Sequence, residues 1–265
     1  MYTLHINKDN VKDMVKYVAI SKELVQEIIT LEDLNRLNIY EFNLLIGIYG
    51  LLANGLDDVS LTANGVCALI KPNNTTIITK AIAEATAKSL IEKVMLSCKF
   101  KQMFDVFMVE YSDGRKKEFD GMRIKIWREY QSLFGADKKE GNYVLMKFNE
   151  IKSINSVYAK SLYIILSFWR SIGKARASER VIMNAFGDTD MHKTRQSVRR
   201  CLPSLAKFFK GLSFSIETKK RNDMIDVYDE DNSPVAFYIF RFQKNINFGW
   251  KKWKSERDES EKVSD

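Results

Sequence analysis

Apolar and polar positions along the chain form two successive series of predicted elements, and the first series lies in its N-terminal half. The pattern predicts a helix (36–53), a short strand (57–62), a helix (63–70), an amphipathic helix (75–94) and two strand-like runs (104–130). Asn54-Gly55 marks the end of the first helix, and Asp113-Gly114 is a strong hairpin signal between the two runs. The predicted order is therefore helix, strand, helix, helix and hairpin.

The same order appears again in the C-terminal half. Its elements are a helix (156–169), a strand-helix passage (177–187), a turn (188–192), a helix (193–209) and alternating strands around polar turns (212–243). A polar, glycine-bearing stretch, 135–143, reads as a loop between the two series. We therefore expect an α+β fold of two winged-helix domains in tandem. The expected segments are an N-terminal domain (1–142), a C-terminal domain (143–247) and a charged, flexible tail (248–265).

Composition excludes several classes of protein. The chain of 265 residues is 45% hydrophobic, yet it has no run of apolar residues long enough to span a membrane and no signal peptide, so we expect a cytoplasmic protein without membrane contact. Its three cysteines are far apart and its only histidines are His5 and His192, so neither a zinc site nor a paired-histidine nicking motif can be written. No phosphate-binding loop of the helicase type is present. We expect no metal, no cofactor and no enzymatic activity.

Charge is distributed unevenly between the halves. Residues 1–150 contain 20 Lys and Arg and 20 Asp and Glu, whereas residues 151–265 contain 22 and 14, so the second half carries the whole net charge of +8. Such asymmetry indicates an electrostatic task confined to one half, and nucleic acid is the commonest polyanion served by such a surface. A merely basic, solvated surface is the alternative interpretation.

The predicted helix 193–209 concentrates this charge at its start. Its region begins "MHKTRQSVRR" (191–200), without an acidic residue, and an apolar stripe follows: Val198, Leu202, Leu205, Phe208 and Phe209. A positive first turn is unfavourable against the helix dipole unless an anionic partner offsets it. In a helix-turn-helix the second helix places its N-terminal residues in the major groove. Pro203 predicts a kink or a break in this helix.

We therefore assign candidate DNA contacts to this helix. They are Lys193, Thr194, Arg195, Gln196, Arg199 and Arg200. Arg195 or Arg199 can pair bidentately with guanine and Gln196 with adenine, whereas Lys193 and Thr194 are expected to hold phosphates. A solvated basic helix face is the alternative.

Two predicted hairpin tips add further candidates. They contain Lys219, Lys220 and Arg221 in the second unit, and Arg115, Lys116 and Lys117 in the first. A basic wing tip can reach the adjacent backbone or minor groove, although charged tips are also commonly just solvated. The third helix of the first unit is far less basic, so that unit is expected to bind DNA weakly or to serve mainly as an interaction surface.

Three segments resemble the Rep_3 family of plasmid replication initiators. SVYAKSLYIIL (156–166) is similar to a characteristic helix of that family, RQSVRRCLPSLAKFFKGLSFSIE (195–217) to its basic recognition helix and the following strand, and residues 59–95 to the strand and two helices of its first domain. The resemblance covers about residues 30–243. Ser197 and Val198 depart from the aromatic and basic pair that often stands there in the family.

The resemblance implies binding to repeated origin sequences (iterons) in double-stranded DNA, opening of an adjacent A+T-rich region and recruitment of host replication proteins. It also implies a dimer, formed through the first domain, that represses its own gene, and a monomer that initiates. A transcriptional regulator of the same architecture and a winged-helix protein–protein adaptor remain alternatives.

Overall fold

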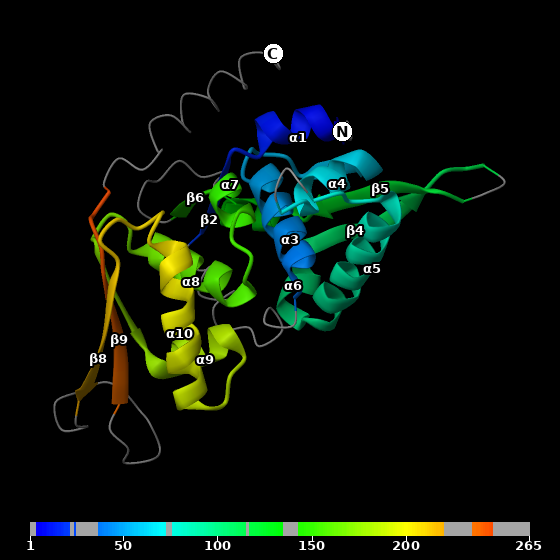
Figure 1. Ribbon diagram of the computed structural model, residues 1–265. Helices are drawn as coiled ribbons and strands as arrows, with labels where there is room; N and C mark the ends of the chain where they lie inside the picture. Colours follow the sequence, from blue (N-terminus) through cyan, green and yellow to red (C-terminus); the bar gives the residue numbers. More distant parts are fainter. Residues whose placement is uncertain are drawn as a thin grey trace.

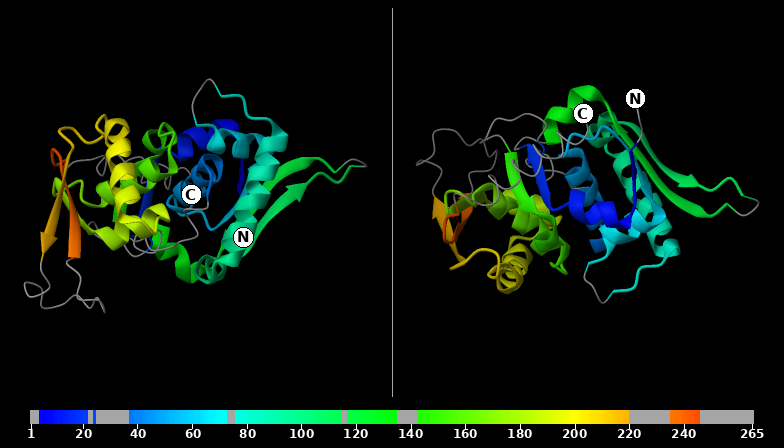
Figure 2. Two further views of the ribbon diagram at one scale, coloured as in Figure 1. Left: turned by 60° about the horizontal axis from the view of Figure 1, so that its bottom comes forward. Right: turned by 90° about the horizontal axis from the view of Figure 1, so that it is seen from above.

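The computed structural model describes residues 4–21, 24, 37–72, 76–114, 117–134, 143–219 and 235–245. Helices and strands are mixed throughout, so the predicted α+β class is confirmed. Figures 1 and 2 show the N-terminal elements on one side, the elements after residue 156 on the other, and a small sheet of two strands between them. No helix in the described ranges is long and apolar enough to cross a membrane.

The N-terminal unit has the predicted order of elements, with additions before it. Its elements are β1 (Leu4–Ile6), α1 (Lys8–Met14), β2 (Tyr17–Ser21), α3 (Ile39–Leu52), β3 (Asp58–Thr62), α4 (Ala63–Ile70), α5 (Lys80–Leu96), α6 (Cys98–Met103), β4 (Phe104–Tyr111), β5 (Phe119–Ile126) and the 3-10 helix η2 (Arg128–Phe134). The prediction contained α3, β3, α4, α5 and the β4–β5 hairpin; it did not contain β1, α1, β2, α6 or η2. The hairpin extends well beyond the body of the unit (Figure 1).

The C-terminal unit repeats the order of helix, strand, helix, helix and hairpin. Its elements are β6 (Tyr143–Lys147), α7 (Phe148–Lys152), α8 (Val157–Phe168), β7 (Lys174–Ser178), α9 (Glu179–Phe186), α10 (Met191–Leu205), β8 (Ser213–Lys219) and β9 (Val235–Arg241). The predicted series corresponds to α8 through β9, whereas β6 and α7 were not predicted. Both halves therefore have the element order expected of a winged helix.

Side-chain caps account for several helix ends. At α3, Asn38 Oδ1 accepts from the backbone N–H of Glu41 (3.0 Å), and the Glu41 carboxylate accepts from the N–H of Asn38 (2.7 Å), a reciprocal capping box. Gly55, with φ of 82°, lies just beyond the C-terminal end of this helix. Thr79 caps α5 by accepting from the N–H of Ile82 (3.3 Å). The caps place the starts of α3 and α5 at Ile39 and Lys80, a few residues after the predicted starts at 36 and 75.

Each unit contains its own sheet. The strand order is β1-β3-β5-β4 in the N-terminal sheet, where only the β1–β3 pair is parallel, and β7-β9-β8 in the C-terminal sheet, which is antiparallel. Gly121 on β5 lies so close to β3 that an added Cβ would stand 1.8 Å from the Leu61 carbonyl oxygen. A glycine at position 121 is therefore a condition for the pairing of these two strands.

The two units are joined by backbone pairing. β6 starts at Tyr143, one residue after the predicted boundary at 142, and pairs antiparallel with β2 over five residues, from Tyr17 with Lys147 to Ser21 with Tyr143. One continuous cluster of buried apolar side chains includes members from both units. The domain boundary at 142 stays a prediction. The strand that follows it, β6, is hydrogen-bonded to β2 of the N-terminal unit.

A buried lysine adds a polar link between the units. Lys160 on α8 is fully buried, and its Nζ donates to Asn43 Oδ1 on α3 (2.8 Å) and to the carbonyl of Ile151 on α7 (2.5 Å). Asn43 in turn donates to the carbonyl of Ile70 (3.1 Å). Burial, with a smaller contribution from the charge of Lys152, lowers the pKa of Lys160 from 10.5 to about 7.

Candidate nucleic-acid interface

Helices α9 and α10 are joined by a short turn whose residues fix both helix ends. Ser178 caps α9 by accepting from the N–H of Val181 (3.3 Å), and α9 ends at Phe186, where Gly187 is the C-cap with a left-handed φ of 64°. Asp190 caps α10 and accepts from the N–H groups of His192 (2.7 Å) and Lys193 (3.4 Å). α10 packs against α8 and α9. This arrangement gives α10 the place of the second helix in a helix-turn-helix.

The buried face of α10 anchors it to the core. Its buried residues are Thr194, Ser197, Val198, Cys201 and Leu205. Thr194, Val198, Cys201 and Leu205 recur three or four positions apart, and with Ser197 they form one stripe of the helix. The helix continues past Pro203 to Leu205, so it does not break at the proline as one form of the prediction had it.

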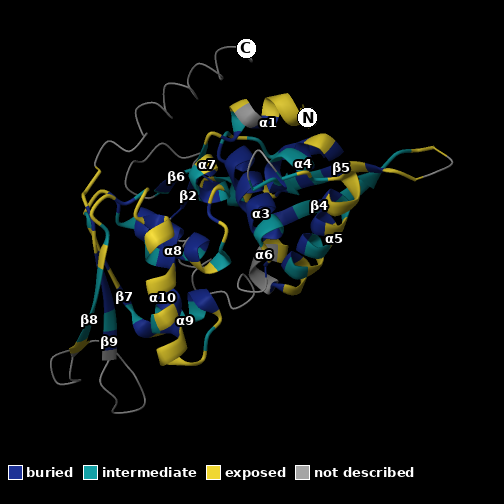
Figure 3. Ribbon diagram, viewed as in Figure 1, coloured by how far each residue is buried: buried dark blue, intermediate teal, exposed yellow. Residues whose placement is uncertain are grey.

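The opposite face of α10 is exposed and basic. His192, Lys193, Gln196, Arg199 and Arg200 are all exposed, and Figure 3 shows this face as exposed bands along the helix. Within the part of the chain that the structure describes, Arg199 and Arg200 form no ion pair. The helix therefore presents two arginines and an amide to solvent in its first three turns.

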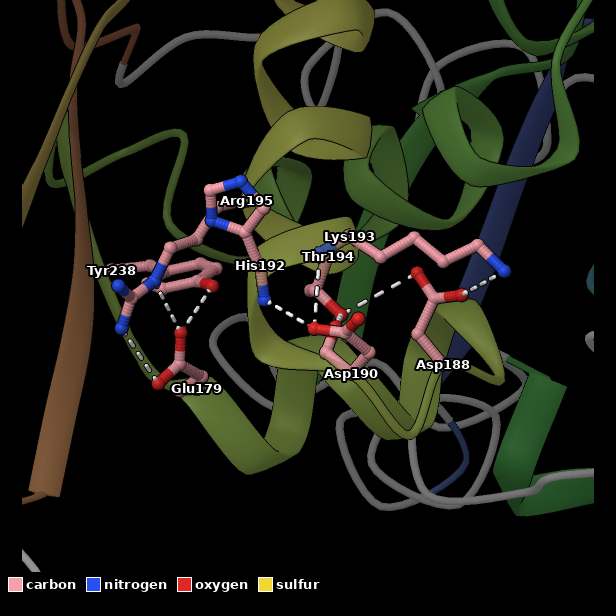
Figure 4. Close-up of polar contacts among 8 residues, drawn as sticks. All are labelled: Glu179, Asp188, Asp190, His192, Lys193, Thr194, Arg195 and Tyr238. Atoms are coloured by element: carbon pink, nitrogen blue, oxygen red, sulfur yellow. Dashed lines mark hydrogen bonds and ion pairs between the residues drawn. The ribbon is translucent and has the colours of Figure 1, made fainter.

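Thr194 does not fit the phosphate contact assigned to it. Its side chain is fully buried, and its hydroxyl donates to the carbonyl of Asp190 (3.0 Å) and lies 3.4 Å from Asp188 Oδ2 (Figure 4). A buried hydroxyl satisfied inside the turn cannot reach a phosphate without opening the α9–α10 turn. We therefore assign Thr194 to the structure of the turn.

Acidic residues from outside the sequence 191–200 balance part of its charge. The buried Glu179 at the start of α9 accepts from Arg195 Nε (2.9 Å) and Nη2 (3.2 Å), and this pairing is the main cause of the raised pKa of Arg195. Lys193 Nζ lies 4.0 Å from Asp188 Oδ1, although the Lys193 side chain remains 70% exposed. The expectation of an unbalanced first turn is therefore corrected: Asp188 and Asp190 lie at the same helix end.

Tyr238 completes the cluster around Glu179. Its hydroxyl donates to Glu179 Oε1 (2.5 Å), so one carboxylate joins the start of α9, the second turn of α10 and strand β9 (Figure 4). Burial, followed by the contact with Glu179, raises the pKa of Tyr238. Glu179 was not among the sequence candidates, because its partners are 16 and 59 positions away and no local pattern brings them together.

The hairpin-tip candidates are described only in part. Lys219 ends β8, and Lys117 is exposed just before β5. The side chain of Lys219 and the residues Lys220, Arg221, Arg115 and Lys116 lie outside what the structure describes. In the N-terminal unit, Lys88 on α5 pairs with Glu84 (2.8 Å), so this charge of the corresponding third helix is compensated on the helix itself.

Comparison with solved structures finds a likeness in fold, whereas the comparisons of sequence find none. No protein-family model matches the chain, and no curated protein matches its sequence significantly. The fold is similar to the crystal structure of Pi initiator protein in complex with iteron DNA, with a TM-score of 0.54 and 11% sequence identity. The match covers 88% of this chain and 99% of that one. The likeness therefore extends over both units and concerns the fold.

Proposed function

We propose that this protein binds double-stranded DNA through the exposed face of α10 and acts as a plasmid replication initiator on repeated origin sequences. The observation that carries the proposal is the set of exposed donors on the second helix of a helix-turn-helix: Gln196, Arg199 and Arg200. The likeness in fold to an initiator crystallised with iteron DNA supports the choice of an initiator over other DNA-binding proteins.

The stereochemistry of the exposed face suggests how α10 contacts DNA. Gln196 and Arg199 lie three positions apart on one stripe, and in a major groove the amide reads adenine while the guanidinium reads guanine. Lys193 and Arg200 flank this stripe and bind phosphates, which fixes the register of the helix. The basic hairpin tips contact the DNA backbone next to this groove.

The finer parts of the proposal extend beyond contact with DNA. Bound to direct repeats, the protein promotes opening of adjacent duplex and recruits host replication proteins, and as a dimer it represses its own gene. The N-terminal unit serves in dimerisation and makes secondary DNA contacts. These roles come from the family resemblance and the likeness in fold, and the contacts on α10 do not depend on them.

The test is a binding and footprinting experiment with DNA flanking the coding region, run at two salt concentrations. We expect protection of direct repeats, with one protomer on each. Arg199→Ala should weaken binding to the repeats by about 1–3 kcal/mol and relax the preference at one base pair. Arg200→Ala should weaken binding to all sequences and reduce the salt slope by about 1.

Lys8→Ala provides the control, because Lys8 is an exposed lysine on α1, a helix that lies well away from α10 in Figure 1. Equal losses for Lys8→Ala and Arg199→Ala would refute the assignment of α10. Protection of a single palindrome by a dimer would indicate a transcriptional regulator instead. Binding that is absent or independent of salt would indicate an adaptor.

A further inference from the structure

The Arg195–Glu179 ion pair has two opposite interpretations. Either the carboxylate neutralises Arg195 and removes it from DNA binding, or it fixes the guanidinium in one orientation for a partner. The Arg195 side chain is 35% exposed whereas that of Glu179 is 8% exposed, so the pair opens to solvent on the arginine side. The geometry of the guanidinium shows which of its N–H donors remain available to a partner.

Glu179 forms hydrogen bonds with one edge of the Arg195 guanidinium and not with a second edge. It accepts from Nε (2.9 Å) and Nη2 (3.2 Å), which is the side-on arrangement. A guanidinium has five N–H donors in a planar fork, so the edge formed by Nη1 and the second hydrogen of Nη2 is directed away from Glu179. That edge presents two parallel N–H donors, which match the O6 and N7 acceptors of guanine in a bidentate pair.

The carboxylate is itself held in place. Glu179 is buried at the start of α9, and the Tyr238 hydroxyl donates to its Oε1 (2.5 Å) from β9. The Tyr238 ring is fully buried and packs against Phe214, at 5.4 Å between ring centroids. Figure 4 shows the Arg195 side chain running from α10 towards β9 to meet these two groups. Arg195 thus projects from a rigid support that lies between α10 and the hairpin.

We propose that Glu179 and Tyr238 are positioning residues, which hold Arg195 so that its free edge reads one guanine of the DNA site. This inference rests on the proposed function and deepens it, because it assigns sequence specificity to two residues that themselves touch no DNA. Because the rotamer of Arg195 is fixed before binding, the side chain loses less conformational entropy on the DNA than a free arginine would, and this favours binding. Gln196 and Arg199 then read neighbouring bases from the exposed stripe.

The experiment uses the full chain and the flanking-DNA fragment that the wild type protects, with each base pair replaced in turn. Glu179→Gln keeps the size of the side chain but loses the carboxylate. We expect it to reduce the preference for guanine at one position roughly 5- to 150-fold, the discrimination of one bidentate pair. Affinity for unrelated DNA should not fall, since a negative charge near the phosphates has been removed. Arg195→Ala should lose preference at the same position.

Two further variants control for folding and for charge. Tyr238→Phe retains the buried ring and should relax the same position more weakly, which keeps the proposal testable if Glu179→Gln does not fold. Glu217→Gln removes a half-exposed glutamate on β8 and should leave every base preference unchanged.

The outcomes separate this inference from the proposed function. Unchanged preference in a folded Glu179→Gln protein, or an equal loss on every sequence, would overturn the positioning role while leaving the Arg199 result intact. A wild-type protein without any sequence preference would overturn both.

Discussion

Replacing Lys160 with methionine tests the buried link between the two units. Methionine has similar length and no charge, but it leaves Asn43 Oδ1 and the carbonyl of Ile151 without their donor. Each orphaned acceptor costs about 1–3 kcal/mol, whereas the cost of burying an ammonium group disappears. These two effects oppose each other at any single pH, so the informative quantity is the dependence of stability on pH.

The magnitude follows from the pKa of Lys160, which is about 7 in the folded chain and 10.5 for an ordinary lysine. Between these values the unfolded chain binds one more proton than the folded chain, so the free energy of unfolding of the wild type increases with pH. Each pKa unit corresponds to about 1.4 kcal/mol. From about pH 6 to pH 9 the wild type should gain about 2 to 3 kcal/mol relative to Lys160→Met.

Urea unfolding followed by tryptophan fluorescence at several pH values measures this difference. Comparing the variant with the wild type cancels contributions from other titrating groups. Lys174→Met, which changes an exposed lysine on β7, should keep the wild-type profile. Parallel profiles for wild type and Lys160→Met, within about 0.5 kcal/mol, would show that Lys160 does not titrate in this range and would refute the reasoning.

Two other predictions concern packing and thiol chemistry. Gly121→Ala should strongly destabilise the N-terminal unit, because its Cβ would lie 1.8 Å from the Leu61 carbonyl oxygen; thermal unfolding measures this, and an unchanged Tm would contradict the close approach of β3 and β5. Cys201 should resist alkylation in the folded protein at pH 8, because burial raises its pKa to about 11; mass spectrometry after iodoacetamide treatment checks this, and labelling of Cys201 as fast as that of the half-buried Cys67 would contradict it.

The fold was predictable where local chemistry decides it. Helical periodicity with Asn54-Gly55, and strand alternation around Asp113-Gly114, predicted α3, β3, α4, α5 and the β4–β5 hairpin, and similar signals predicted α8 through β9 in the second unit. The strands β1, β2 and β6 escaped prediction because they are three to five residues long and their partners are distant in sequence. Such pairings are set by tertiary packing, which periodicity does not report.

The sequence could indicate the helix that carries the candidate site, but not the exposure and the hydrogen-bond partners of each side chain on it. The sequence named Gln196 and Arg199 as candidate DNA contacts on this helix, and the structure has both side chains exposed on α10. The sequence also named Thr194 and Arg195 as DNA contacts. In the structure the Thr194 hydroxyl donates to the Asp190 carbonyl and lies near Asp188, and Glu179 holds one edge of the Arg195 guanidinium. Those acids come from the turn and the preceding helix, so only the three-dimensional arrangement reveals the pairing.

The pairing of β2 with β6 has a consequence for how the chain folds during its synthesis on the ribosome. The partner of Ser21 is Tyr143, more than 120 residues later. At a synthesis rate of about 5 to 20 residues per second, β6 leaves the ribosome roughly 6 to 25 s after β2. During that interval Val18 and Ile20, which are fully covered in the finished protein, have no sheet neighbour from β6. Translation speed and chaperone access over residues 21–147 therefore bear on the yield of correctly assembled molecules.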